Sequence, residues 1–214
     1  MSPIASAQER IARTLTVTGR GVENIQTSIA LVRLGVEVQG KTAQEVQAEV
    51  ARRSSAVVTL LRSRNVDKLE TTGIRLNPVY SYTNNVQRIE GYQASNIVSF
   101  RIGNDRAGNL LDEAVKAGAT RIDGVSFVAS DEAIKTAQKQ ALREATEDAQ
   151  QQADAVFQTL KLTRREIVSI QVNGAAVPPP RPIAEFANTA KVASTPIIAG
   201  EQEVEASVTL QISY

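Results

Sequence analysis

The sequence predicts an α+β fold in which a mainly antiparallel sheet packs against one long alanine-rich helix and two shorter helices. Three patterns in the 214 residues lead to this fold. Residues 131–160 contain no Gly or Pro and repeat alanine at every fourth position, which is typical of a long helix. Residues 201–214 alternate between apolar and polar side chains, as strands with one buried face do. Residues 69–82 and 86–102 have the pattern of a long β-hairpin.

The chain opens with two predicted strands, Arg13–Arg20 and Ser28–Gln39. Gly19 and Gly21 lie at the end of the first strand, and we expect them to form the turn between the two strands. They are a weak signal for a phosphate-binding loop, because no third glycine follows and the next segment is a strand. Gly35 lies inside the second strand and predicts a bulge or kink there.

A helix is predicted from Thr42 to Arg64. Thr42 and Glu45 have the spacing of a capping box, which marks a helix start. Arginines gather on one side of this helix, and no aromatic residue lies among them. We therefore expect a solvated face, and contact with an anionic partner is the alternative. These arginines are Arg52, Arg53, Arg62 and Arg64.

The hairpin strands are Leu69–Tyr82 and Val86–Ile102. Asn77-Pro78 interrupts the first strand, which predicts an edge or bulged strand, because proline cannot donate to a ladder. The polar and aromatic tip of this hairpin is either a contact arm or a plain loop. The candidate contact residues in it are Tyr80, Tyr82, Asn84, Asn85 and Arg88.

A short helix (Arg106–Ala117) and a strand (Arg121–Ala129) precede the long helix Asp131–Leu160, and a further strand (Arg165–Asn173) follows it. A row of small residues lets a backbone approach closely but buries little area, so the long helix needs a broad partner such as a sheet. A helix–helix seam between subunits is the alternative. The alanine row is Ala133, Ala137, Ala141, Ala145, Ala149 and Ala153, and Ile134, Leu142, Val156 and Leu160 extend its apolar face.

Residues 174–200 hold five of the seven prolines and interrupt the regular pattern. Polyproline segments are stiff and do not pair in a sheet, so we expect a long surface loop. Long loops in compact domains often have a function, and oligomer contact is the function expected here. The candidate contact residues in the loop are Pro178, Pro179, Pro180, Arg181 and Phe186.

The composition excludes several classes of chemistry. The chain has no Cys and no His, which removes disulfides, thiolate metal sites, the commonest general base and every Ser-His-Asp device. The 24 basic and 23 acidic residues nearly balance, which argues against a nucleic-acid partner. Three acidic pairs, Asp112-Glu113, Asp131-Glu132 and Glu147-Asp148, occupy adjacent helical positions about 100° apart, so spacing makes none of them a catalytic dyad. We predict no catalytic, cofactor or metal site.

The first residues indicate export. Ala5-Ser6-Ala7 is similar to the small-residue end of a secretory signal, although the basic and apolar regions that should precede it are missing. No apolar run approaches the ~20 residues of a transmembrane helix. We expect a tail over residues 1–12, a single domain over residues 13–214, and a periplasmic or secreted location after removal of a leader.

The order of these segments resembles the SIMPL-domain family, which includes periplasmic oxidative-stress-defence proteins and outer-membrane-associated antigens. Each segment alone is a plain α+β pattern, and the ordered set is more specific. The segments are RTLTVTGRG, SIALVRLGVEVQGKTAQEV, YQASNIVSFRIG, RIDGVSFVASDE and TPIIAGEQEVEASVTLQISY. The resemblance implies an exported α+β protein with no established enzymatic chemistry, and assembly of some members into large rings.

The sequence leads us to expect one of two functions, and a third is less well supported. The first is a non-enzymatic envelope protein that acts through homo-oligomeric assembly or an envelope protein partner, with a part in oxidative-stress defence that the resemblance implies. The alternative is a small-molecule binding module with a pocket between the sheet and the long helix. A carboxylate-based hydrolase is the third, and the acidic pairs above are better explained as solvated faces. No cofactor is expected.

Overall fold

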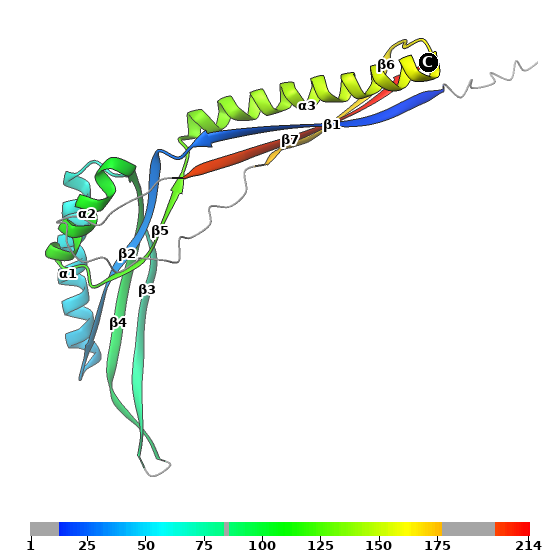
Figure 1. The fold of residues 1–214 in the computed structure, drawn as a ribbon. Coiled ribbons are helices and arrows are strands. Elements are labelled where there is room, and N and C mark those ends of the chain that lie inside the picture. Colours follow the sequence, from blue (N-terminus) through cyan, green and yellow to red (C-terminus); the bar gives the residue numbers. More distant parts are fainter. Residues whose placement is uncertain (1–12, 84–85, 177–199) are drawn as a thin grey trace, which may run out of the picture. The chain divides into compact units, whose positions relative to one another are not determined.

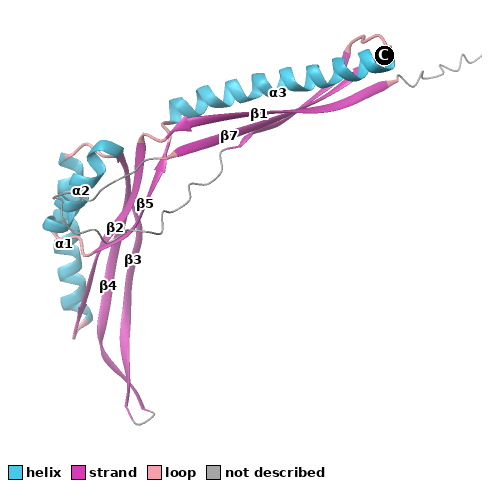
Figure 2. Cartoon of the chain, viewed as in Figure 1, coloured by secondary structure: helices cyan, strands magenta, loops and turns pink. Residues whose placement is uncertain are grey.

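The computed structural model describes residues 13–83, 86–176 and 200–214, which form two compact units (Figure 1). The long-helix unit contains residues 13–25, 131–176 and 202–214, and the two-helix unit contains residues 26–130, 200 and 201 of this described part. Each unit has its own sheet and its own helices, as Figure 2 shows. The α+β class and the antiparallel pairing are confirmed, and the single domain over residues 13–214 stays a prediction.

The two-helix unit is a four-stranded antiparallel sheet in the order β3-β4-β2-β5, with α1 and α2 on one face (Figure 1). Its core joins alternate residues of β2 and β4 to the inner sides of both helices, with Leu34, Leu61 and Phe100 fully enclosed. Its elements are β2 (Ile29–Gly40), α1 (Ala43–Ser63), β3 (Asp67–Thr83), β4 (Val86–Gly103), α2 (Asn104–Ala117) and β5 (Arg121–Val128).

Local signals predicted the ends of both helices in this unit. The Thr42 side chain accepts a hydrogen bond from the backbone N–H of Glu45 at 3.3 Å, so Thr42 is the N-cap of α1. Gly118 ends α2 with a φ of 121°, a conformation that favours glycine. Both predicted helix ends are confirmed.

The predicted irregularities in the sheet are also confirmed. β3 is an edge strand, and its pairing with β4 shifts register at three places. The pairing of β2 with β5 shifts between Arg33 and Leu34, next to Gly35. A Cβ atom on Gly35 would lie 2.5 Å from the backbone oxygen of Asn96, so the close approach of β4 explains why glycine occupies this position.

The long-helix unit is a three-stranded sheet in the order β1-β7-β6, with α3 lying along it (Figure 1). Its elements are β1 (Thr14–Gln26), α3 (Asp131–Leu160), β6 (Ile167–Ala176) and β7 (Glu201–Ser213). β7 is antiparallel to β6. It is also antiparallel to β1, because Tyr214 donates to the backbone oxygen of Arg13 while Thr209 contacts Thr18 further along. The prediction that the long helix packs on a sheet is confirmed.

The predicted turn at Gly19 and Gly21 is wrong, because both glycines lie inside the continuous strand β1 under α3. A Cβ atom on Gly19 would lie 2.1 Å from the backbone oxygen of Ala145, and one on Gly21 would lie 2.0 Å from that of Ala141. Two strand residues advance about 6.6 Å and four helical residues about 6 Å. The spacing of the glycines therefore matches the spacing of the alanines, and two backbones meet directly.

One end of the long helix differs from the prediction. Five of the six alanines are buried, as expected, and so is Phe157, which lies four residues after Ala153 and continues the row. Leu160 was expected on the apolar face, yet 60% of it is exposed. The Phe157 ring instead contacts Tyr214 at the end of the chain, with ring centroids 5.8 Å apart. The alanine row winds slowly around the helix, so its last turn faces a different direction.

Candidate functional site

A stripe of exposed apolar side chains runs along the edge strand β3. Alternate residues of a strand point to the same side, so these five residues share one face of β3. The exposed fraction is 65% for Ile74 and 72% for Tyr82, and the residues between them are also exposed. We call this set the β3 stripe: Ile74, Leu76, Pro78, Tyr80 and Tyr82.

The tip of the hairpin continues this surface. Ile89 lies opposite Tyr80 in the register of the two strands and is 54% exposed, while Arg88 lies opposite Ser81. Figure 1 shows the hairpin extending past the N-terminal end of α1. The structure therefore brings Tyr80, Tyr82 and Arg88 together on one exposed hairpin, and their role as contact residues stays a prediction.

The remaining predicted contact residues lie outside the described residues. Asn84 and Asn85 belong to this group at the hairpin turn. The others come from the proline-rich segment and are Pro178, Pro179, Pro180, Arg181 and Phe186. Their contact role stays a prediction.

A second exposed apolar edge lies on β6, and the sequence analysis did not mark it. Ile170 pairs with Leu210 and Val172 pairs with Val208, so all four side chains share the face that α3 covers. Leu210 and Val208 are buried, whereas Ile170 is 62% exposed and Val172 55%. The apolar face of this sheet thus continues beyond α3. The apolar side chains on both faces of Ile167–Val172 were the signal that could have shown this.

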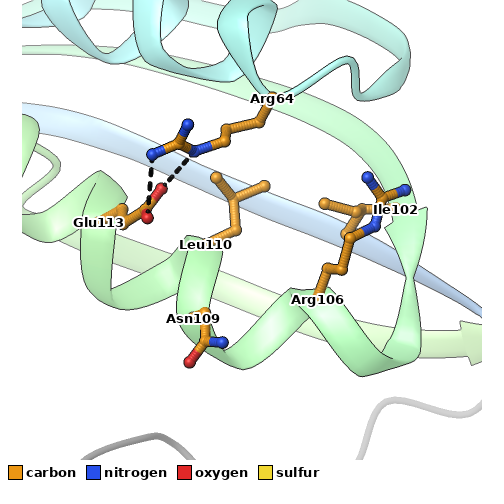
Figure 3. Close-up of a pocket in the computed structure, with 6 residues that line it drawn as sticks. All are labelled: Arg64, Ile102, Arg106, Asn109, Leu110 and Glu113. Atoms are coloured by element: carbon orange, nitrogen blue, oxygen red, sulfur yellow. Dashed lines mark hydrogen bonds and ion pairs between the residues drawn. The ribbon is translucent and has the colours of Figure 1, made fainter.

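A small cavity lies in the two-helix unit, between the end of α1 and one side of α2 (Figure 3). Its volume is about 160 Å³. It is lined by Arg64, Ile102, Arg106, Asn109, Leu110 and Glu113. No sequence pattern marks this cavity, because its residues come from three separate segments; the pocket predicted from the sequence lay beside the long helix instead.

An ion pair crosses one end of this cavity. Arg64 donates from Nε to Oε2 of Glu113 at 2.7 Å and from Nη2 to Oε1 at 3.1 Å. These hydrogen bonds from Arg64 lower the pKa of Glu113. On α1 itself, Arg52 and Arg53 both bond to Glu49, and these bonds lower the pKa of Glu49 to about 2. Three of the four arginines expected on a solvated face are therefore exposed members of ion pairs.

The interacting carboxyl pair in the long-helix unit is not one of the three sequence-adjacent pairs. Glu23 follows Gly21 on the β1 face under α3, and Glu144 extends from α3 toward it. Desolvation and a hydrogen bond with Glu144 raise the pKa of Glu23. Asp148, one turn further along α3, accepts a hydrogen bond from the backbone N–H of Arg20 at 2.9 Å. The bond from Arg20 to Asp148 therefore holds α3 beside β1, whereas Glu23 and Glu144 attract each other only while one of them is protonated.

Replacing Glu144 with Gln should return the pKa of Glu23 toward 4.5, because the second carboxyl group is removed. A raised pKa means that Glu23 stabilises the fold below pH 4.5 and loses this contribution as the pH rises through its folded-state value. NMR titration of the Glu23 side-chain carboxyl carbon measures the shift. Glu147→Gln, on an exposed position of the same helix, is the control and should leave the titration unchanged.

The described residues contain neither a cluster of metal ligands nor a membrane-spanning helix. Within residues 13–83, 86–176 and 200–214, no three acidic side chains converge as metal ligands do. None of the helices in these ranges combines the length and apolar character needed to cross a membrane.

The comparison with protein families decides the relationship that the sequence suggested. Residues 15–212 match the model of the SIMPL family, described as a protein of unknown function (DUF541). The chain belongs to the SIMPL family. The SIMPL resemblance drawn from the ordered segments is thereby confirmed.

Two curated relatives of this SIMPL chain come from Brucella. A protein of Brucella melitensis named 26 kDa periplasmic immunogenic protein is 29% identical over 224 aligned residues, covering 95% of this chain and 87% of the relative. The protein of the same name from Brucella abortus has the same identity and coverage. The relationship thus extends over nearly the whole of both chains.

Proposed function

We propose that this SIMPL protein is an exported, non-enzymatic protein of the cell envelope that acts by binding other copies of itself or an envelope protein. The periplasmic name of its Brucella relatives supports a periplasmic location. The observation on which the binding function rests is the β3 stripe, an exposed apolar row on the outer strand of the sheet that the described residues form.

An edge strand presents unpaired backbone N–H and C=O groups, and proteins usually protect such edges with charges, proline or a bulge. β3 has Pro78 and three register shifts, but its apolar row is still exposed. The β3 stripe contains no charged residue and includes two tyrosines, which are enriched at protein interfaces. A partner strand added to β3 would satisfy the backbone groups and cover the apolar row together. Pro78 limits this pairing to segments on either side of it.

The edge of β6 offers a second surface of the same kind, because Ile170 and Val172 are exposed beside a buried row. Two different edges on one chain permit head-to-tail contacts, which close into rings when the rotation between copies allows it. This arrangement supports assembly over binding of a single partner.

The chemistry of the chain supports a non-enzymatic role. His and Cys are absent from the sequence, and several acidic side chains are engaged by arginines or by backbone groups. With a single Met and no Cys, the protein is a poor sacrificial target for oxidants. A part in oxidative-stress defence, which we also propose, would therefore act through a bound partner.

Replacing Tyr80 and Tyr82 together with Ser should shift the solution mass toward the 23.0 kDa of a single chain, because the apolar row loses its two aromatic side chains. Light scattering over a range of protein concentrations measures this mass. Ile122→Ser is the matched control, since Ile122 is 43% exposed on β5, the opposite edge of the same sheet. A wild-type mass of 23.0 kDa at every concentration contradicts assembly.

The alternative function, small-molecule binding, was expected in a pocket between the sheet and the long helix, and the packing of α3 on β1 argues against that location. α3 contacts β1 through backbone atoms at Gly19 and Gly21, which leaves no space for a ligand at the centre of that interface. A cavity in the described residues lies between α1 and α2 instead.

A further inference from the structure

We propose that the cavity between α1 and α2 binds a small organic monocarboxylate, with its carboxylate on Arg106 and its apolar group on Ile102 and Leu110. This site is independent of the assembly surface on β3. Its apolar lining residues are Ile102 and Leu110, and each is 3% exposed in the free chain, so a ligand meets only the outermost atoms of these side chains. Its rim is polar, with Arg64, Arg106 and Glu113 around Leu110 in Figure 3.

Arg106 is the guanidinium group available to a ligand. Arg64 already gives two hydrogen bonds to Glu113, whereas no residue in the described part of the chain forms a hydrogen bond or ion pair with Arg106. A guanidinium group presents a planar fork of donors that matches a carboxylate in a bidentate manner. The Arg106 guanidinium group, next to Ile102 and Leu110, can therefore bind a carboxylate that carries an apolar group.

The charge and the volume of the cavity favour a small monoanion over a dianion. Two arginines and one glutamate give the lining a net charge of +1, which suits a monoanion. A phosphate dianion would face the Glu113 carboxylate, and it has no apolar group to place against Ile102 and Leu110. The volume of about 160 Å³ is close to that of an engineered protein cavity that admits benzene, about 150 Å³. Benzoate is therefore a suitable probe.

Titration of the full-length chain with benzoate, followed by NMR of the backbone amides, tests this site. We expect saturable shifts confined to the amides of α2 and the end of α1, with a Kd on the order of 1 mM for so small a ligand. Benzamide has the same shape without the charge, and it should bind at least about tenfold more weakly, as should inorganic phosphate. Equal shifts with benzamide overturn the proposal.

Two substitutions with opposite expected effects identify the residues. Arg106→Gln should weaken benzoate binding about tenfold or more, while Arg62→Gln, an exposed arginine near the end of α1, should leave it unchanged. Glu113→Gln releases Arg64 and removes the negative charge, so binding should become several-fold tighter. Thermal unfolding of each variant shows that it is folded. Unchanged affinity in Arg106→Gln, or weaker binding in a folded Glu113→Gln, contradicts the proposal.

Discussion

Replacing Gly21 with Ala is expected to lower the free energy of unfolding of the long-helix unit by about 3 kcal/mol, the upper part of the range for overpacking. The added Cβ would lie 2.0 Å from the backbone oxygen of Ala141 and 2.7 Å from the backbone nitrogen of Ala145. Backbone atoms in the middle of a long helix cannot rotate away as a side chain can, so α3 must move off the strand. Urea unfolding followed by the helical circular dichroism signal measures the loss.

Gly19→Ala should have a similar effect, since its Cβ would meet the backbone of Ala145 and Ala149. Gly124→Ala is the matched control: Gly124 also lies in a strand, but no atom lies within 4 Å of its added Cβ. We expect that control to change stability by less than about 1 kcal/mol. Equal stability of Gly21→Ala and Gly124→Ala contradicts the backbone contact between α3 and β1.

Replacing Phe157 with Ala is expected to cost about 3–5 kcal/mol, the usual range for removing a buried aromatic side chain. Phe157 is 3% exposed and is the largest buried side chain of α3. It belongs to the same core cluster as Leu210 and Ile212 of β7 and contacts the ring of Tyr214. Alanine residues fill the rest of the buried helix face, so no neighbouring side chain of α3 can occupy the space that remains. Urea unfolding measures this loss as well.

Leu160→Ala is the control for this prediction, because Leu160 lies in the next turn and is 60% exposed. Its replacement should change the free energy of unfolding by no more than about 0.5 kcal/mol. A larger loss from Leu160→Ala than from Phe157→Ala contradicts the assignment of Phe157 to the core.

The sequence predicted the elements well where local rules decide them. The bounds of α3 are those expected from its composition, and the caps of α1 and α2 follow from Thr42 and Gly118. The prediction failed at Gly19 and Gly21, because a glycine between strands and a glycine beneath a helix look alike in sequence. Only the packing of α3, more than a hundred residues later, separates the two cases.

The candidate sites were less accessible to sequence reasoning. Tyr80 and Tyr82 could be marked because aromatic residues at a hairpin end are locally unusual. The cavity could not, since Arg64 and Arg106 meet only through the packing of α1 on α2. The exposure of Ile170 and Val172 depends on how far α3 extends across the sheet, which no local pattern records.

The alanine repeat alone would allow α3 to pack on β1 in several positions along the helix axis. A slide of four residues along the helix axis, about 6 Å, would bring another pair of alanine backbones over Gly19 and Gly21. Phe157 beside Tyr214, and Asp148 on the amide of Arg20, break this translational symmetry and select one position. Phe157, the one bulky side chain in a row of alanines, thus fixes the register of α3 on β1.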